Sequence, residues 1–553
     1  MTGPAGALSC EGLCARYGAR VAFSGVTAEF PPGTVTLVSG PNGAGKSTLL
    51  SILARASSPA AGRVLLGGRP AESVARREYA RAVSFLPQSP DSSALGGIAV
   101  RDVVAAGRIP HSGFFAGVSE ADEEAASAAL RAVGLGGFGE RDAASLSGGE
   151  TRRMFLASTL AQDAGTILLD EPFEGLDAAS RASLASLVRR FAAEGRAVVV
   201  ATHDESPLAG IALRRIGLGA APGPCAAPPP ESADARAGGA AEAPAAAGPR
   251  SAGGPARLAV LAALAAAAGA ALLADAFSGP RDLVLAWRLP RLATAFCCGG
   301  TLAVCGALCQ TLFRNPLASP YTLGVASGAT FGACLATLLA RGAAPVGAAA
   351  FAGACLSFAA VRACGGSGRS PRLLLGGVAC AWLFSSGTMV CQFALAPWES
   401  FSMAHWSLGS VAAAQGAWRV VLPLALAAAA STAALSRPLD AMLSGDDSAA
   451  SRGIDAARLR TGLLAFSSLL VACVVAVCGP VGFVGLLVPH LGRLVAGGAH
   501  RRLLPFCTVF GGLFLALCDA AARALPVPGT LPVGVATSLL GAPLLVFLLA
   551  RRR

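Results

Sequence analysis

A glycine-rich segment near the N-terminus has the residue types of a loop that binds phosphate. It reads GPNGAGKST, follows an apolar run that ends at Ser39, and precedes a helical pattern over residues 49–54. Glycines allow successive backbone N–H groups to point at anionic oxygens, and the following helix adds its positive N-terminal end. We therefore predict that the loop binds ATP through Gly40, Pro41, Asn42, Gly43, Ala44, Gly45, Lys46, Ser47 and Thr48.

Lys46 is the only lysine in the chain, and every other basic residue except five histidines is an arginine. An ammonium is a compact point charge, whereas a guanidinium is a wide fork, so a lysine is expected where arginine does not fit. We predict that Lys46 contacts the β- and γ-phosphates and that the Ser47 hydroxyl is a ligand of Mg²⁺.

Two adjacent carboxylates, Asp170 and Glu171, end a short apolar run that begins at Thr166. A buried strand that ends in two acids after a phosphate loop has the residue types needed for nucleotide hydrolysis. We predict that Asp170 holds Mg²⁺ and that Glu171 polarises the attacking water as a general base.

The elements that must position these residues alternate between β-type and helical patterns over residues 1–219. Strands are expected at residues 34–39, 82–86, 166–169 and 197–201, each apolar enough for a sheet buried on both faces. This alternation predicts an α/β domain built around the phosphate loop. Residues 220–256 are rich in Ala, Pro and Gly and predict a flexible linker.

Residues 257–553 are predicted to form an all-α polytopic membrane domain. The chain is 54% hydrophobic and only 14% charged, with a mean hydropathy of +0.60. About ten apolar stretches are long enough to cross a bilayer. They are 257–275, 291–312, 320–340, 343–363, 372–396, 418–436, 459–479, 480–498, 503–524 and 531–550. The stretch 480–498 contains two prolines and a histidine, which leaves a broken or re-entrant segment open.

The net charge of +12 does not indicate nucleic-acid binding, because the arginines are scattered and form no basic stripe with interleaved aromatic residues. With the linker in the cytoplasm, 13 arginines fall in the predicted inner connections and ends and six fall outside. This asymmetry predicts that both termini are cytoplasmic. The N-terminus lacks the pattern of a signal peptide, so the first domain is expected in the cytoplasm. Most of the 16 cysteines lie in apolar runs and are expected to pack between helices.

The segment Leu146-Ser-Gly-Gly-Glu150 resembles the signature of ABC transporters, with Glu150 where glutamine is commoner. The resemblance extends over about residues 7–215. It implies that Gln88 and His203 join Glu171 in catalysis, that Gln88 also meets the Mg²⁺, and that Tyr17 stacks on adenine. It also implies a D-loop at Asp177, within EGLD where SALD is commoner. Finally, Ser147, Gly148, Gly149 and Glu150 would complete the phosphate site of a second copy, so the resemblance implies a homodimer that binds two ATP.

Residues 281–550 resemble permeases that import iron–siderophores, haem and vitamin B12. The resemblance rests on RLPR at residues 288–291, on RNPLASP at 314–320 and on GFVGLLVPH at 482–490. It implies ten helices per subunit in the bacterial cytoplasmic (inner) membrane, a metal-chelate cargo and an external substrate-binding protein. No cluster of carboxylates or histidines in the spans indicates a path for a bare metal ion.

The same resemblance implies roles for two further groups of residues. Arg288, Arg291 and Arg523 would pair with acidic residues of the binding protein, although arginines at a membrane interface also snorkel toward water. The loop LSGDDSAASRGID would couple the permease to the ATPase through Asp446, Asp447 and Arg452. A solvated loop is the alternative for these three residues.

Three functional classes differ in what they require of the sequence. An importer of an iron chelate, haem or a corrinoid fits both resemblances. A half-exporter of a small molecule would have about six spans and no docking arginines. A non-transport ABC protein would lack the membrane domain. The sequence leaves the choice among siderophore, haem and cobalamin open.

Overall fold

The computed structural model describes residues 7–18, 20–90, 92, 94–113, 117–219, 266–275, 277, 280–340, 346–365, 371–411, 417–525 and 531–550. The chain divides into two compact units. The first contains Met1–Arg250 and Arg437–Ala456, and the second contains Ser251–Ser436 and Ala457–Arg553. The predicted linker 220–256 lies outside the described residues.

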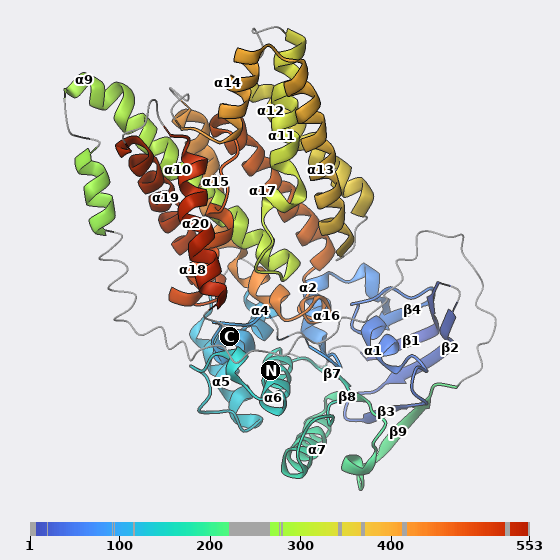
Figure 1. Ribbon diagram of the computed structural model, residues 1–553. Helices are drawn as coiled ribbons and strands as arrows, with labels where there is room; N and C mark the ends of the chain where they lie inside the picture. Colours follow the sequence, from blue (N-terminus) through green and yellow to red (C-terminus); the bar gives the residue numbers. More distant parts are fainter. Residues whose placement is uncertain are drawn as a thin grey trace. The chain divides into compact units, whose positions relative to one another are not determined.

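A five-stranded parallel sheet forms the centre of the first unit (Figure 1). Its strand order is β6-β7-β8-β3-β9, and every neighbouring pair is parallel. All residues of β7 and β8 are buried, as expected for a parallel sheet covered on both faces. The four strands predicted from the sequence are confirmed. The bounds are β3 Val35–Ser39, β6 Val83–Leu86, β7 Thr166–Asp170, β8 Ala197–Ala201 and β9 Leu213–Gly217.

A second, antiparallel sheet has the order β2-β1-β4-β5. It comprises β1 Leu8–Tyr17, β2 Arg20–Phe30, β4 Ala61–Leu66 and β5 Arg69–Pro70. One hydrophobic core joins this sheet to helix α1, Lys46–Leu53, and to one face of the parallel sheet. The tight burial of α1 fixes the loop that precedes it.

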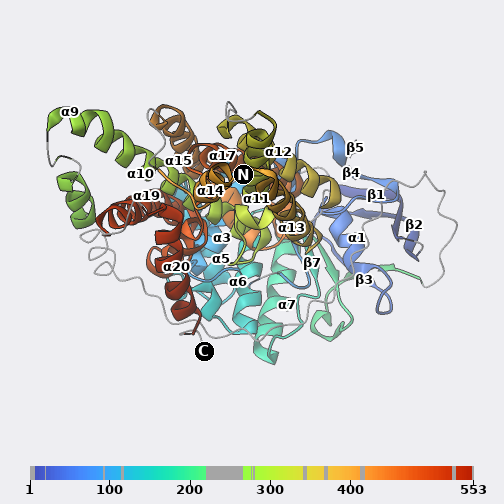
Figure 2. The same ribbon diagram turned by 45° about the horizontal axis from the view of Figure 1, so that its top comes forward.

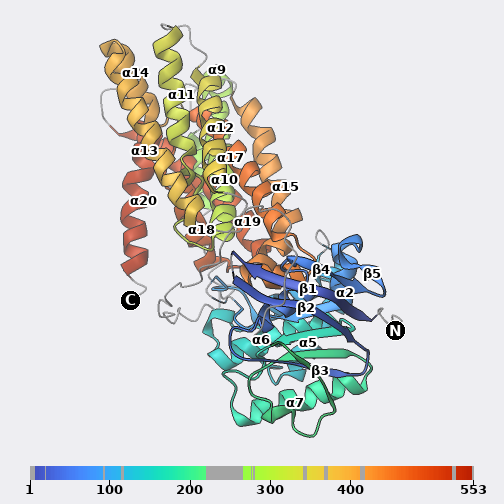
Figure 3. The same ribbon diagram turned by 90° about the vertical axis from the view of Figure 1, so that its right-hand side faces the viewer.

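Helices cover the other face of the parallel sheet (Figure 3). Helix α5 begins at a capping box between Ser119 and Asp122, which satisfies backbone donors in its first turn. The helix bounds are α2 Arg76–Ala82, α3 Val100–Ala105, α4 Ile109–Ser112, α5 Glu120–Ala132, α6 Gly148–Ala161 and α7 Ala178–Ala193. The first unit is therefore an α/β fold, as predicted.

The second unit is helical in its described residues. It begins with a short helix, Ala266–Asp275, followed by α9 Arg281–Leu283 and a π-helical turn, Val284–Arg288. The remaining helices are α10 Leu289–Phe313, α11 Val325–Ala340, α12 Val346–Gly365, α13 Pro371–Ala394, α14 Pro397–Ser407, α15 Trp418–Leu443, α17 Ala456–Cys478, α18 Val484–Val495, α19 His500–Ala524 and α20 Val533–Ala550. Helix α15 ends in the first unit, where it is followed by α16, Asp446–Ser451.

Small residues bring the helices of the second unit close together. Helix α10 packs along α19, and α11 packs along α12 (Figure 2). A side chain on Gly299 of α10 would collide with the backbone oxygen of Gly511 on α19. Without water to expel, helices in a bilayer associate through such close packing, which favours glycine and alanine at their contacts.

Five described helices are long and apolar enough to span a membrane, and the bent helix α15 gives a sixth if its two parts count as one span. Each of the ten predicted stretches overlaps a helix, but in four of them the apolar helix has only 10–17 residues, with α20 counted over Val533–Phe547. The count of ten therefore stays a prediction. In the segment 480–498, the helix begins only at Val484, after Phe483 with a φ of 65°.

Candidate functional site

The predicted phosphate loop runs from the end of β3 to the start of α1. Gly43 and Gly45 have φ angles of 82° and 89°, a left-handed conformation that glycine adopts without strain. Lys46 is only 8% exposed, and its Nζ donates to the carbonyl oxygens of Gly40 at 2.8 Å and Pro41 at 3.3 Å. The ammonium group is thus folded back over the loop whose N–H groups are predicted to hold phosphate.

Tyr17 lies beside the end of this loop. Its hydroxyl shares a hydrogen bond of 3.0 Å with Thr48 Oγ1, and the side chain is partly exposed. The aromatic ring predicted to stack on adenine is therefore next to the predicted phosphate site.

Asp170 ends strand β7 and is 2% exposed. Its carboxylate is hydrogen-bonded by the Ser47 side chain and by the backbone of Gln88. Burial, together with the charge of Glu171, nevertheless raises the pKa of Asp170 to about 6. Its Oδ1 atom is buried without a hydrogen-bond partner among the described residues. An oxygen in this position, beside a serine hydroxyl, fits the oxygen donors that Mg²⁺ prefers.

Glu171 and His203 form a pair at the edge of the sheet. Glu171 Oε2 lies 2.9 Å from His203 Nδ1, and it also accepts the backbone N–H of His203 at 3.4 Å. Glu171 has a φ of 45°, and its own N–H donates to Ala201 O at 2.8 Å. Strands β3, β7 and β8 are neighbours, so their carboxyl ends bring the loop, the two acids and the histidine to one edge. Ligands of open α/β sheets bind at this edge.

The backbone of Gln88 lies at this edge of the sheet, because it is hydrogen-bonded to the Asp170 carboxylate. Its side-chain Nε2 donates to Glu174 Oε2 at 3.5 Å, and its carbonyl oxygen accepts from Arg152 Nη1 at 2.7 Å. The amide group predicted to meet Mg²⁺ is hydrogen-bonded to Glu174 in this structure.

The predicted signature forms the start of helix α6. Ser147 caps the helix and Glu150 completes a capping box, with Glu150 Oε2 accepting from the Ser147 N–H and hydroxyl at 2.8 Å each. These hydrogen bonds hold the pKa of Glu150 below its ordinary value. In the described residues, no hydrogen bond or ion pair joins Ser147, Gly148, Gly149 or Glu150 to the phosphate loop. The structure does not bring the signature together with the loop of its own chain.

Asp177, the predicted D-loop residue, caps helix α7. Its Oδ1 accepts the backbone N–H of Ser180 at 2.9 Å. Hydrogen bonds from Ser180 lower the pKa of this exposed carboxylate. A local role as a helix cap is therefore already present in the single chain.

The predicted coupling loop is part of the first unit, and it is hydrogen-bonded to helix α6 of that unit. Arg452 is buried, and its Nη2 donates to Ser158 Oγ on α6 at 2.9 Å. Desolvation lowers the pKa of Arg452 to about 10, so the side chain remains charged at neutral pH. Asp446 and Asp447 lie in the first turn of α16, where carboxylates favour the helix dipole.

Further contacts of this segment were not predicted. Gln162 donates to Ser451 O at 2.7 Å, and Arg76 lies 3.1 Å from Asp455. Arg437 donates to Ser112 Oγ at 2.7 Å, and its guanidinium lies 3.9 Å from the Asp122 carboxylate.

Asp122 is placed by the capping box of α5. Burial raises its pKa, but hydrogen bonds from Ser119 and Arg108 and the charge of Arg437 outweigh that effect and lower it. A buried carboxylate near an arginine from a segment over 300 residues away in sequence carries no local sequence signal.

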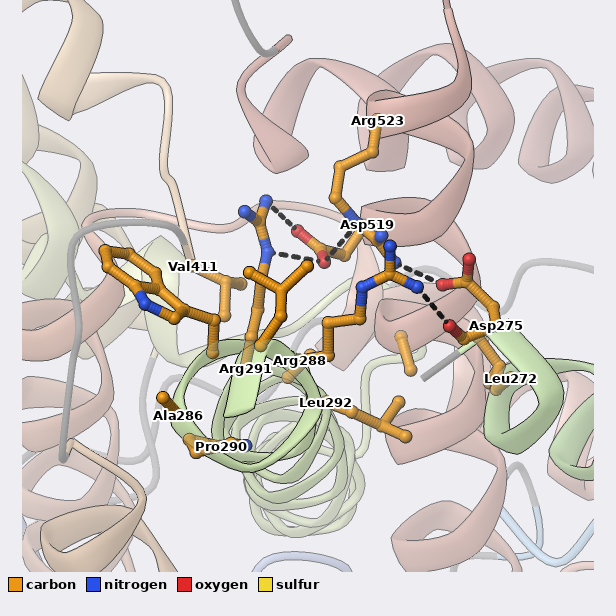
Figure 4. A pocket seen from close by; sticks show the side chains of 14 residues that line it. Leu272, Asp275, Ala286, Arg288, Pro290, Arg291, Leu292, Val411, Asp519 and Arg523 are labelled. Carbon is orange, nitrogen blue, oxygen red and sulfur yellow. Dashed lines mark hydrogen bonds and ion pairs between the residues drawn. The ribbon is translucent and has the colours of Figure 1, made fainter. Parts of the chain in front are cut away.

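The three predicted docking arginines line one cavity of about 300 Å³ in the second unit (Figure 4). Arg291 donates to both oxygens of the buried Asp519, at 2.9 and 2.8 Å. Arg523 lies 2.8 Å from Asp275 and 3.4 Å from Asp519, and Arg288 donates to Asp275 O at 2.7 Å. Sequence reasoning missed both aspartates. Asp519 lies four residues before Arg523 on one helix, and this spacing was the available signal.

Two family profiles match the chain. The profile described as the FecCD transport family matches residues 257–551. The chain belongs to the FecCD transport family. The profile described as ABC transporter matches residues 23–174, which include the phosphate loop, the signature and both acids. This FecCD family member therefore carries an ABC ATPase domain, binds ATP, and is an integral membrane protein that couples ATP hydrolysis to transport.

Three named relatives each align with about half of this chain. The Fe(3+) dicitrate transport system permease protein FecC of Escherichia coli is 36% identical over 282 residues, which cover 49% of this chain and 84% of that protein. The cobalamin import system permease protein BtuC of Halobacterium salinarum is 38% identical over 272 residues, 48% of this chain and 72% of that protein. The hemin transport system permease protein HmuU of Yersinia pestis is 36% identical over 279 residues, 48% and 82% respectively.

Proposed function

We propose that this chain is one half of an importer that moves an iron chelate, haem or a corrinoid across the bacterial cytoplasmic membrane. The observation that carries the proposal is the presence of an ATPase site and a FecCD permease in one chain. Relatives named for ferric dicitrate, cobalamin and hemin support the cargo class. In this proposal residues 1–219 are the cassette, 220–256 the linker and 257–553 the permease. The five or six long apolar helices agree with the span number of a half-exporter, but the match of residues 257–551 to the FecCD transport family favours the importer.

The working unit is a homodimer that binds two ATP molecules. Each chain contains one phosphate loop and one signature, and the described residues show no hydrogen bond or ion pair between them. The signature of one copy, Ser147 to Glu150, completes the phosphate site of the other. The capping box between Ser147 and Glu150 opens when the Ser147 hydroxyl binds a phosphate oxygen instead.

Asp170 and Ser47 would hold Mg²⁺, and Gln88 would be a further ligand once its amide is released from Glu174. The buried Oδ1 of Asp170, which has no hydrogen-bond partner among the described residues, supports this assignment. When bound, the ion neutralises charge that develops on the phosphate oxygens.

Glu171 acts as the general base for hydrolysis. Its carboxylate accepts a hydrogen bond from the attacking water, and His203 orients it through the 2.9 Å contact between Nδ1 and Oε2. Lys46 releases the carbonyls of Gly40 and Pro41 to bind the β- and γ-phosphates. The partly exposed ring of Tyr17 stacks on adenine.

Two groups of charged residues connect hydrolysis to transport. Arg452, with Asp446 and Asp447 on the same coupling segment, transmits closure of the cassettes to the permease. Arg288, Arg291 and Arg523 dock an acidic surface of an external binding protein, which is periplasmic or lipid-anchored. The ATPase domain and both termini are cytoplasmic, in agreement with the arginine asymmetry.

The proposal is tested by measuring ATP hydrolysis by the purified full chain in lipid nanodiscs. Cargo together with its binding protein is expected to stimulate hydrolysis, whereas cargo alone is not. Strong stimulation by cargo alone, with no effect of a binding protein, would favour the half-exporter.

A further inference from the structure

Arg152 joins three parts of the ATPase site by hydrogen bonds to backbone carbonyls. It lies in the first turns of helix α6, two residues after Glu150. Its Nη1 donates to Gln88 O at 2.7 Å, and its Nη2 donates to Asp170 O at 3.0 Å and to Glu171 O. One guanidinium thus connects the signature helix to the backbone of three predicted site residues.

The backbone that Arg152 holds is in an uncommon conformation. Glu171 has a φ of 45°, and a non-glycine residue in this region persists only where its surroundings fix it. The N–H of Glu171 is held by Ala201 O, and its carbonyl is held by Arg152. These two contacts fix the peptide groups on both sides of the Glu171 side chain, and so direct its carboxylate toward His203.

The charge around Arg152 strengthens this arrangement. Burial lowers the pKa of Arg152, whereas the carboxylates of Glu174, Asp170 and Glu171 favour its charged form. A charged donor makes shorter and stronger hydrogen bonds than a neutral one. A lysine would supply a single point of contact. The planar guanidinium instead reaches the backbone carbonyl of Gln88 on one side and those of Asp170 and Glu171 on the other.

We propose that Arg152 is a positioning residue that makes the Glu171 carboxylate and the Gln88 loop move with the signature helix. This inference rests on the proposed function, in which the start of α6 binds the nucleotide of the partner copy. Occupancy of the opposite site therefore sets the position of the base in this chain. The two ATP sites of the dimer become cooperative through Arg152.

The test compares Arg152→Gln with the matched control Arg190→Gln in full-length protein in nanodiscs. Arg190 lies on α7 and pairs with Glu194 at the surface, outside the site. Arg152→Gln is expected to lower kcat about 10-fold or more, because small displacements of a catalytic group reduce rate steeply. The dissociation constant for ATP should stay within about 2-fold of the unmodified chain, and the Hill coefficient for hydrolysis should fall to about 1. Arg190→Gln should change none of these values.

The inference is overturned if Arg152→Gln keeps its kcat and cooperativity, or if ATP affinity falls in parallel with kcat. Should this variant fail to fold, Arg152→Lys, which keeps the charge, is expected to show the same loss of cooperativity, and retained cooperativity would refute the role. An inactive unmodified chain, or an active Glu171→Gln variant, would instead contradict the proposed function itself.

Discussion

Oε2 of Glu171 lies 2.9 Å from Nδ1 of His203, across the carboxyl ends of two neighbouring strands. Glu171 is 7% exposed, and both of its backbone groups are hydrogen-bonded. A carboxylate held in this way has a fixed orientation, which is what the proposed role as general base requires. The predicted base and the predicted histidine are therefore hydrogen-bonded to each other in this structure.

Replacement of Glu171 by Gln removes the proposed base while keeping the side chain's shape. We expect steady-state hydrolysis to fall about 100-fold or more, since general base catalysis contributes at least this much. ATP binding should persist, and ATP should accumulate in a closed dimer. Hydrolysis of ATP and the amount of bound nucleotide are measured together. Glu194→Gln is the control, because Glu194 pairs with Arg190 at the exposed C-terminal end of α7. Unchanged hydrolysis in Glu171→Gln would refute the assignment.

The raised pKa of Asp170, about 6, predicts a pH dependence of stability. The folded state binds a proton more tightly here than the unfolded state does, so stability falls as pH rises from about 4 to about 6. Asp170→Asn removes this loss and should stabilise the nucleotide-free chain at pH 7.5 by up to about 3 kcal/mol.

The measurement is the denaturation midpoint of the full chain, without nucleotide and with a chelator, between pH 4 and pH 8. The gain from Asp170→Asn should shrink as pH falls below about 6. The same variant should lose Mg²⁺-dependent hydrolysis. A midpoint that drops in Asp170→Asn at pH 7.5 would contradict the prediction.

Arg452→Met tests the coupling segment. Methionine keeps much of the volume of the buried arginine, but it cannot donate to Ser158 Oγ. We expect the amount of cargo moved per ATP hydrolysed to fall about 10-fold. Arg501→Met, at an exposed position of α19, serves as control. An unchanged ratio in Arg452→Met would exclude a coupling role for this contact.

Substitutions of Arg288 and Arg291, which line the cavity in Figure 4, should differ in their effects on stability and on docking. Arg291 makes two hydrogen bonds to the buried Asp519, so Arg291→Ala leaves that carboxylate with weaker pairing and should cost about 3 kcal/mol of stability. Arg288 donates to a backbone carbonyl, so Arg288→Ala should weaken docking of the binding protein with a smaller loss of stability. Thermal denaturation and binding of the partner protein are measured in parallel. Equal losses of stability in the two variants would count against this distinction.

The nucleotide site could be predicted because its residues belong to short, contiguous motifs. The order strand, loop and helix around Lys46 is local, and the strand before Asp170 is identified by its apolar run. The parallel sheet then brings the ends of these strands together without further information.

The side-chain partners could not be predicted in the same way. The pair Asp519 and Arg523 has a local spacing. By contrast, the contacts of Asp519 with Arg291, of Asp275 with Arg523 and of Asp122 with Arg437 join segments distant in sequence and depend on how the helices pack. The number of spans was also hard to predict, because alanine and glycine pack helices closely but add little hydropathy. Gln88 was predicted by its place in a motif, and its side-chain partner Glu174 depends on the loop conformation.

The most direct test of the account is uptake by the full chain in proteoliposomes, with its ATPase domain facing an ATP-filled lumen and binding protein and labelled cargo outside. Ferric chelate, haem and cobalamin are supplied in separate assays, and Glu171→Gln is reconstituted in parallel. We predict that one of these cargoes accumulates in the lumen only with hydrolysable ATP, and that Glu171→Gln accumulates none. ATP-dependent movement of cargo in the opposite direction, or uptake that Glu171→Gln retains, would contradict it.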